Sequence, residues 1–197
     1  MPGIQELVAL IELRREDRSL EYKESHPWEE LKNKIAKTTL GMSNIRDGGT
    51  IIVGVSERSG RPVPEGMSQE DINTYNEDDV RAYVNSFADP YVQLELHRIS
   101  QDKQAFIAIV VHEFDQVPII CKKGGIGLRG GAVYTRSYRM PETCEVPSQT
   151  EMREIIEMAT DKGVRRFLER SRRVGLLTGE AVGPTDTEKF DEELEGL

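Results

Sequence analysis

Cysteine, histidine and long apolar stretches are scarce in this sequence of 197 residues. The two cysteines, Cys121 and Cys144, show no metal-ligand spacing and cannot build a disulfide framework, so we expect reduced thiols in a reducing compartment. His26, His97 and His112 fall in separate segments, which gives no spacing for a zinc site or a catalytic triad. No stretch approaches the roughly 18 apolar residues of a membrane span, and no signal-peptide pattern begins the chain. We therefore expect a cytoplasmic protein without a membrane partner.

Charge, by contrast, is abundant and unevenly distributed. The net charge of −9 disfavours nucleic acid as a partner, because phosphate neutralisation needs Lys and Arg. Residues 116–140 nevertheless carry five bases and no acid, and residues 162–173 carry six bases and one acid. Residues 178–197 carry seven acids and one base. Each basic region is either solvated or a surface for phosphates, and the second could also dock an acidic partner.

The apolar residues come in periodic blocks that predict both helices and strands. Steps of three and four residues from Trp28 to Met42 indicate an amphipathic helix, and the β-branched run from Thr50 to Val55 indicates a buried strand. Asn76 and Ser148 are expected to cap two further helices. The remaining expectations are a helix over 2–15, strands over 20–23, 92–96, 105–111, 119–120 and 132–134, a hairpin turn over 100–103, a loop over 60–66 and a break in the last helix at Gly163.

This order of elements predicts an α+β fold: a single domain over residues 1–174, with a mixed central sheet flanked by helices and a C-terminal helix. The acidic residues 175–197 are predicted to form a disordered tail, which could recruit a partner protein.

Three glutamates are candidates for a divalent-metal site. Glu16 and Glu21 lie five residues apart, and Glu57 follows the strand that ends at Val55. Converging carboxylates repel one another unless a hard cation such as Mg²⁺ or Mn²⁺ neutralises them, and such an ion can assist phosphodiester cleavage. Lys23, on the same strand face as Glu21, could stabilise charge that develops on a phosphate. The alternative without a function, a solvated acidic surface, fits the same spacing.

Further cations could hold a nucleic-acid backbone. The glycine-rich segment around Gly125 carries Lys122, Lys123 and Arg129, which fits either phosphate contacts or a solvated hairpin loop. Arg136, at the end of a short predicted strand, could contact a phosphate or form a salt bridge to a nearby acid.

The sequence also resembles a known family. Leu20-Glu21-Tyr22-Lys23, Lys34-Ile35-Ala36, Asn44, the run from Asp47 to Val55 and Gly60 are similar to the motifs of the AlbA_2 family, also called the Schlafen-type DNA-binding domain. Residues 132–137 resemble that family's strand before its C-terminal helix, so the resemblance covers roughly residues 13–159.

The resemblance implies a Schlafen-core fold and a nucleic-acid partner. In Schlafen-type ribonucleases an acidic trio occupies the positions of Glu16, Glu21 and Glu57, which implies a metal-dependent endonuclease and favours RNA over DNA as its substrate. The alternative is a non-catalytic nucleic-acid-binding module, or a regulatory or accessory subunit that recruits a partner protein. A short chain of this kind could also need to form a homodimer to enclose a duplex.

Overall fold

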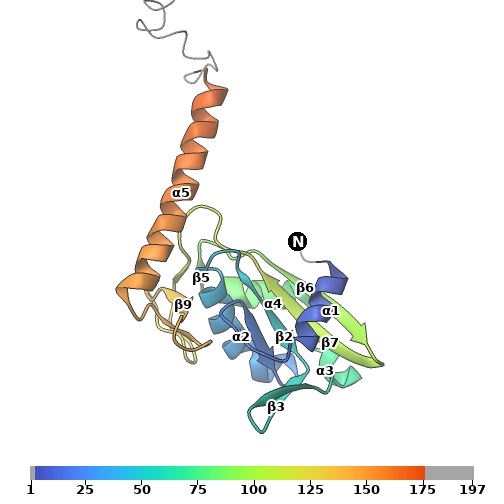
Figure 1. Cartoon of the computed structure of the whole chain (residues 1–197). Helices are drawn as coiled ribbons and strands as arrows, with labels where there is room; N and C mark the ends of the chain where they lie inside the picture. The colour runs from blue at the N-terminus through green and yellow to red at the C-terminus, as the bar shows by residue number, and fades with distance from the viewer. Residues whose placement is uncertain (1–2, 176–197) are drawn as a thin grey trace, which may run out of the picture. The chain divides into compact units, whose positions relative to one another are not determined.

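The computed structural model describes residues 3–175 (Figure 1). These residues fall into two units, one up to Thr160 and one from Asp161 onward. The first unit holds the sheet and most of the helices. The described part of the second unit is the later half of one helix, α5 (Gln149–Arg173), and the two residues after it. The acidic tail predicted from residue 175 lies outside the described residues, apart from Gly175.

A four-stranded mixed sheet forms the centre of the first unit. It consists of β1 (Leu20–Lys23), β2 (Gly49–Val53), β7 (Gln104–Val111) and β6 (Leu94–Gln101), in that spatial order. β1 and β2 run parallel, because the helix α2 (Trp28–Met42) carries the chain back between them. The other two pairs are antiparallel. This arrangement confirms the predicted α+β fold with a mixed central sheet.

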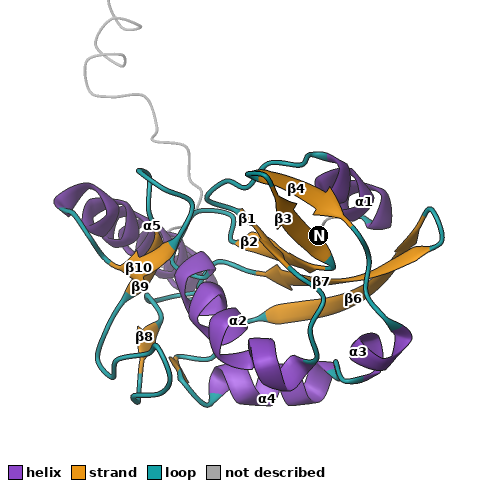
Figure 2. Cartoon of the chain, turned by 90° about the horizontal axis from the view of Figure 1, so that it is seen from below, coloured by secondary structure: helices purple, strands orange, loops and turns teal. Residues whose placement is uncertain are grey.

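Helices cover both faces of this sheet, as Figure 2 shows. On one face, α2 and α4 (Glu77–Asn85) enclose a core that includes Ile51 and Val53 of β2. On the other, α1 (Ile4–Glu12) buries Leu7 and Ile11 against a second core that contains Ile52. Alternate residues of β2 therefore enter different cores, which explains why the strand is apolar without interruption. A short helix, α3 (Gln69–Asn73), precedes α4.

The strand predicted over residues 50–55 is broken at Gly54, whose φ of +110° only glycine adopts readily. The chain leaves the central sheet there and continues as β3 (Val55–Arg58), which pairs with β4 (Arg61–Pro64). The expectation of a loop over residues 60–66 is wrong for the part that forms β4, because Ser59 and Gly60 both take positive φ values and turn the chain back on itself. Glu57 consequently lies within a strand.

The second half of the first unit also contains four short strands. β5 (Ala88–Asp89) pairs with β8 (Ile120–Cys121), and β9 (Tyr134–Arg136) pairs with β10 (Thr143–Glu145). Asn44, just after α2, ties these segments to the centre: its amide group donates to the carbonyl oxygens of Ile119 and Tyr134 at 2.8 and 2.9 Å, and its side-chain oxygen accepts the N–H of Ile119 at 2.8 Å. Its place in the family motif therefore has a structural reason.

Both predicted helix caps are confirmed. The side-chain oxygen of Asn76 accepts the N–H groups of Asp78 and Asp79 at 2.9 and 3.2 Å. Ser148 accepts the N–H of Thr150 and donates to the carboxylate of Glu151. The predicted break at Gly163 is wrong, because α5 continues through it to Arg173. One glycine costs a helix only about 1 kcal/mol, which good helix formers on both sides offset. Within residues 3–175, no helix has the length and apolar character to cross a membrane.

Candidate functional site

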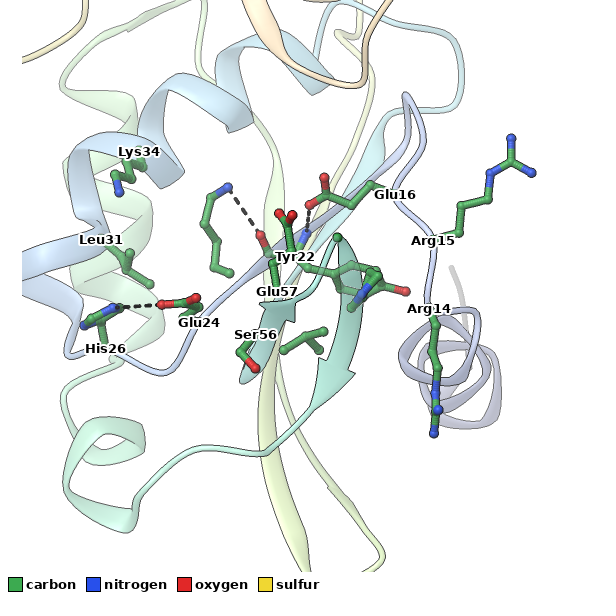
Figure 3. Close-up of a pocket in the computed structure, with 14 residues that line it drawn as sticks. Arg14, Arg15, Glu16, Tyr22, Glu24, His26, Leu31, Lys34, Ser56 and Glu57 are labelled. Atoms are coloured by element: carbon green, nitrogen blue, oxygen red, sulfur yellow. Dashed lines mark hydrogen bonds and ion pairs between the residues drawn. The ribbon is translucent and has the colours of Figure 1, made fainter.

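A cavity of about 620 Å³ opens between the segment after α1, the strand β1, the start of α2 and the β3–β4 hairpin (Figure 3). Glu16, Lys23 and Glu57 all line it, so the structure brings together three of the residues predicted to act in catalysis. Figure 3 shows the carboxylates of Glu16 and Glu57 directed toward the same space. We call this cavity the Glu16–Glu57 pocket.

Glu16 is held in place by the backbone of β1. One of its carboxylate oxygens accepts the N–H of Tyr22 at 2.8 Å, and the Tyr22 hydroxyl donates to the carbonyl of Leu10 at 2.6 Å, which fixes the strand against the end of α1. Burial raises the pKa of the Glu16 carboxyl above its usual range, and the nearby Glu21 adds to the rise, while the Tyr22 N–H opposes it. The site therefore favours a Glu16 that keeps its proton to a higher pH than an exposed glutamate.

Glu21 is bound differently from the other two glutamates. Its carboxylate accepts a hydrogen bond from Arg136 Nη1 at 2.5 Å and also pairs with the ammonium group of Lys23. The side chain of Arg136 is only 1% exposed, and it donates further to the carbonyl oxygens of Asp17 and Arg18 at 3.0 and 3.1 Å. Of the two predictions for Arg136, the salt bridge is confirmed. A guanidinium buried to this extent has no surface left for a phosphate.

The structure does not gather Glu16, Glu21 and Glu57 into one cluster of carboxylates. Among residues 3–175, no group of three or more His, Cys, Asp or Glu side chains could hold a metal ion. Glu21 does not line the Glu16–Glu57 pocket, and its carboxylate pairs with Arg136 and Lys23 instead. The binding of Mg²⁺ or Mn²⁺ by Glu16, Glu21 and Glu57 stays a prediction.

Cations that the sequence patterns did not single out surround the Glu16–Glu57 pocket. Arg14 and Arg15 line it from the segment after α1, and Lys34 lines it from α2. All three are exposed, and within the part of the chain that the structure describes none forms an ion pair with a carboxylate. The sequence did offer a signal for two of these cations, because Arg14 and Arg15 directly precede the predicted site residue Glu16. Lys34 belongs to the family motif Lys34-Ile35-Ala36, but only the fold shows that it lies at the pocket.

Comparison with known proteins identifies the family of this chain. The model of the family described as Schlafen, AlbA_2 matches residues 16–143, about two thirds of the chain. The chain belongs to this family. The match confirms the resemblance expected from the Leu-Glu-Tyr-Lys and Gly-Gly motifs. No curated protein matches the chain.

Two solved structures are similar to this AlbA_2 domain. The DIP2311 protein from Corynebacterium diphtheriae is 19% identical with a TM-score of 0.48, over 76% of this chain and 28% of that one. The N-terminal domain of a protein related to the ATP-dependent DNA helicase RecG, from Nitrosomonas europaea, is 20% identical with a TM-score of 0.45, over 76% of this chain and 99% of that domain. The AlbA_2 chain thus spans less than a third of the length of the first protein.

The glycine-rich segment predicted to hold a nucleic-acid backbone does not line the Glu16–Glu57 pocket. Lys122 donates to the carbonyl of Asn85 at 2.9 Å, and the ammonium of Lys123 lies 4.8 Å from the centre of the Phe87 ring. Arg129 pairs with Glu145 and lines a separate cavity of about 490 Å³. The two groups of predicted site residues are therefore on different parts of the AlbA_2 domain.

One further polar residue, Ser56, lines the Glu16–Glu57 pocket. It lies next to Glu57, and its hydroxyl is buried without a hydrogen-bond partner in residues 3–175. A buried hydroxyl without a partner costs free energy. The Ser56 hydroxyl itself is covered by the protein, so this residue contributes to the wall of the pocket and not to its polar surface.

Proposed function

We propose that this AlbA_2 domain binds a nucleic acid at the Glu16–Glu57 pocket. The observation that carries the proposal is the set of four cationic side chains around this one open cavity: Arg14, Arg15, Lys23 and Lys34. Arg14, Arg15 and Lys34 are not neutralised by carboxylates of the described residues, so their charge is available to a phosphate backbone. Family membership supports the same class of partner.

The carboxylates of the pocket define where the phosphates would sit. Glu16 and Glu57 repel phosphate oxygens, so we place the backbone on the cations and the sugars beside the glutamates. A carboxylate accepts hydrogen bonds from hydroxyl groups, and a ribose offers a 2′-hydroxyl that deoxyribose lacks. This arrangement favours RNA over DNA, in agreement with the resemblance to Schlafen ribonucleases.

Binding of labelled oligonucleotides tests the proposal. Fluorescence anisotropy would compare single-stranded RNA and DNA of one sequence, using the parent chain, Arg14→Gln/Arg15→Gln, and a control, Lys122→Gln/Lys123→Gln, that removes the same charge elsewhere. We expect the Arg14/Arg15 variant to bind RNA roughly tenfold more weakly or worse, because two charge-assisted contacts are lost. The control should change affinity less than about threefold. An equal loss in both variants would show that only overall charge matters and would contradict a site at the pocket.

Metal-dependent cleavage by Glu16, Glu21, Lys23 and Glu57 with Mg²⁺ or Mn²⁺ is the second candidate function. It is supported by the position of Glu16, Lys23 and Glu57 on one pocket, and it is opposed by the ion pair between Glu21 and Arg136. The alternative is a non-catalytic nucleic-acid-binding or accessory module. Homodimerisation and recruitment of a partner protein by the tail also remain predictions.

A nuclease assay separates these candidates. Pooled tRNA, single-stranded RNA and DNA, and duplexes would be incubated with the protein in Mg²⁺, Mn²⁺ or EDTA. Cleavage that EDTA abolishes, and that Glu57→Gln removes while Glu24→Gln leaves it intact, would establish the enzyme. Glu24 is a suitable control because it lines the same pocket but is not one of the predicted ligands. Binding without any cleavage in all three conditions would leave the non-catalytic module.

A further inference from the structure

The second half of α5 and the residue after it expose an unusual number of apolar side chains. Val164, Phe167, Leu168 and Val174 are 51%, 67%, 38% and 68% exposed. At 100° per residue, these four positions fall within an arc of about 120° on one side of the helix. A phenylalanine exposed to this degree, in line with three aliphatic residues, is typical of a surface that contacts another polypeptide. We call these four residues the α5 stripe.

Arginines border the α5 stripe on both sides. In the same helical projection, Arg165 and Arg172 lie along one edge of the stripe and Arg170 along the other. Residues 162–173 carry six bases and a single acid. A partner for this surface therefore combines apolar side chains with flanking carboxylates.

The chain itself contains such a sequence shortly after α5. Within residues 186–197, Phe190, Leu194 and Leu197 recur at the spacing i, i+4, i+7, and six acids accompany a single lysine. Asp191 and Glu193 fall on either side of this apolar line when it is projected on a helix. We propose that residues 186–197 dock on the α5 stripe, with Phe190 and Leu194 against Phe167 and Leu168 and the flanking acids beside the arginines.

The connecting chain is long enough for this contact. Ten residues separate Gly175 from Asp186, and an extended chain of that length reaches about 33 Å. The α5 stripe, from Val164 to Val174, is only about 15 Å long, because a helix rises 1.5 Å per residue. An intramolecular contact is also favoured over an intermolecular one by the high effective concentration that a short connection provides.

Hydrogen–deuterium exchange of the full chain tests the docking without relying on any activity. We expect backbone amides of residues 186–197 to exchange more slowly than in a synthetic peptide of the same sequence. Phe190→Ser should accelerate this exchange roughly tenfold or more, because a buried aromatic side chain is lost. Glu193→Lys should accelerate it roughly threefold, which is the effect of one or two exposed ion pairs. Arg170→Gln, on the helix side, should act in the same direction.

Matched controls keep the result specific to the α5 stripe. Glu180→Lys changes the net charge by the same amount as Glu193→Lys but lies outside residues 186–197, and Arg153→Gln matches Arg170→Gln in the first half of α5. Neither control should alter the exchange of residues 186–197. Free-peptide exchange rates in the parent chain, or equal effects of the variants and their controls, would overturn the proposal. Protection that increases with protein concentration would also overturn it and assign the stripe to a second copy of the chain.

Discussion

Arg136 connects distant parts of the chain through a single side chain. It pairs with Glu21 on β1 and donates to two carbonyl groups of the segment that precedes this strand. Arg18, one of those two residues, in turn forms an ion pair with Glu154 of α5 at 2.6 Å. The chain thus uses charged side chains to hold β1, β9 and the first half of α5 together. Such groups are costly to bury unless their charges and hydrogen-bonding groups are paired, as those of Arg136 are here.

A comparison of two glutamine variants tests this structural role of Glu21. We expect Glu21→Gln to lower the free energy of unfolding by about 1–3 kcal/mol, because it leaves the buried guanidinium of Arg136 without its counter-charge. Glu57→Gln should change the free energy of unfolding by less than about 0.5 kcal/mol, since Glu57 is exposed on the β3–β4 hairpin. Urea denaturation of the two variants measures both values. Equal stabilities would mean that the pair with Arg136 contributes nothing to folding.

Glu16 leads to a prediction about pH. Its folded-state pKa is raised by burial, whereas the unfolded chain titrates near the ordinary value of 4.5. Below that pH the Glu16 carboxyl is protonated in both the folded and the unfolded state, so its titration does not change the free energy of unfolding. As the pH rises from about 4.5 through the folded-state pKa, the unfolded state loses the proton more readily, and the stability of the parent protein falls. In the variant Glu16→Gln, the amide side chain has no proton to lose and can still accept the Tyr22 N–H. The stability of this variant relative to the parent should therefore increase from about pH 4 to about pH 7.

Urea denaturation of Glu16→Gln and the parent at about pH 4, 5, 6 and 7 measures this difference. A difference that stays constant with pH, or that decreases toward neutral pH, would contradict a raised pKa at Glu16.

Two tight turns with similar backbone conformations should respond differently to the same substitution. Gly48 connects α2 to β2 with a φ of +71°, and Gly60 closes the β3–β4 hairpin with a φ of +74°. A Cβ atom at Gly48 would overlap the carbonyl oxygen of Val111, whereas a Cβ at Gly60 has nothing within 4 Å. Gly60→Ala should cost about 1 kcal/mol for its conformation alone, and Gly48→Ala about 2–5 kcal/mol because β7 must also move.

Thermal or urea unfolding of the two alanine variants checks this ranking. If Gly60→Ala were as destabilising as Gly48→Ala, the close approach of the α2–β2 turn to β7 would not be what requires glycine there.

Elements that apolar periodicity marks were predictable, whereas an element that depends on the conformation of a turn was not. The β6–β7 hairpin followed from alternation and a polar turn, in which Asp102 and Lys103 do take positive φ values. β4 was missed because its pairing with β3 depends on the turn at Ser59 and Gly60 rather than on apolar periodicity.

The candidate site was also predictable in part. The family motif was enough to predict that Glu16, Lys23 and Glu57 converge on one pocket, although Glu57 lies 41 residues after Glu16. A salt bridge for Arg136 was one of two predictions, but Glu21 could not be identified as its partner, since the two residues lie 115 positions apart along the chain.

For the whole molecule, the central question is how a chain of net charge −9 could bind a polyanion. Residues 178–197 account for −6 of this charge, as seven acids against one base, so the remaining 177 residues carry only −3. Binding must then rest on a local group of cations, and the salt dependence of affinity counts how many phosphates they neutralise.

The salt dependence of RNA binding therefore gives a quantitative prediction. If the three cations of the Glu16–Glu57 pocket that are unpaired among the described residues, Arg14, Arg15 and Lys34, each neutralise one phosphate of a single strand, log K should fall against log salt with a slope of about −2. Arg14→Gln/Arg15→Gln should reduce the magnitude of that slope by about 1.4, whereas Lys122→Gln/Lys123→Gln should leave it nearly unchanged. Anisotropy titrations between about 50 and about 300 mM salt measure all three slopes. A larger reduction in the Lys122/Lys123 variant would contradict the pocket and place the phosphate contacts on the glycine-rich segment. Lys122 and Lys123 would then have to leave Asn85 and Phe87 to reach the RNA.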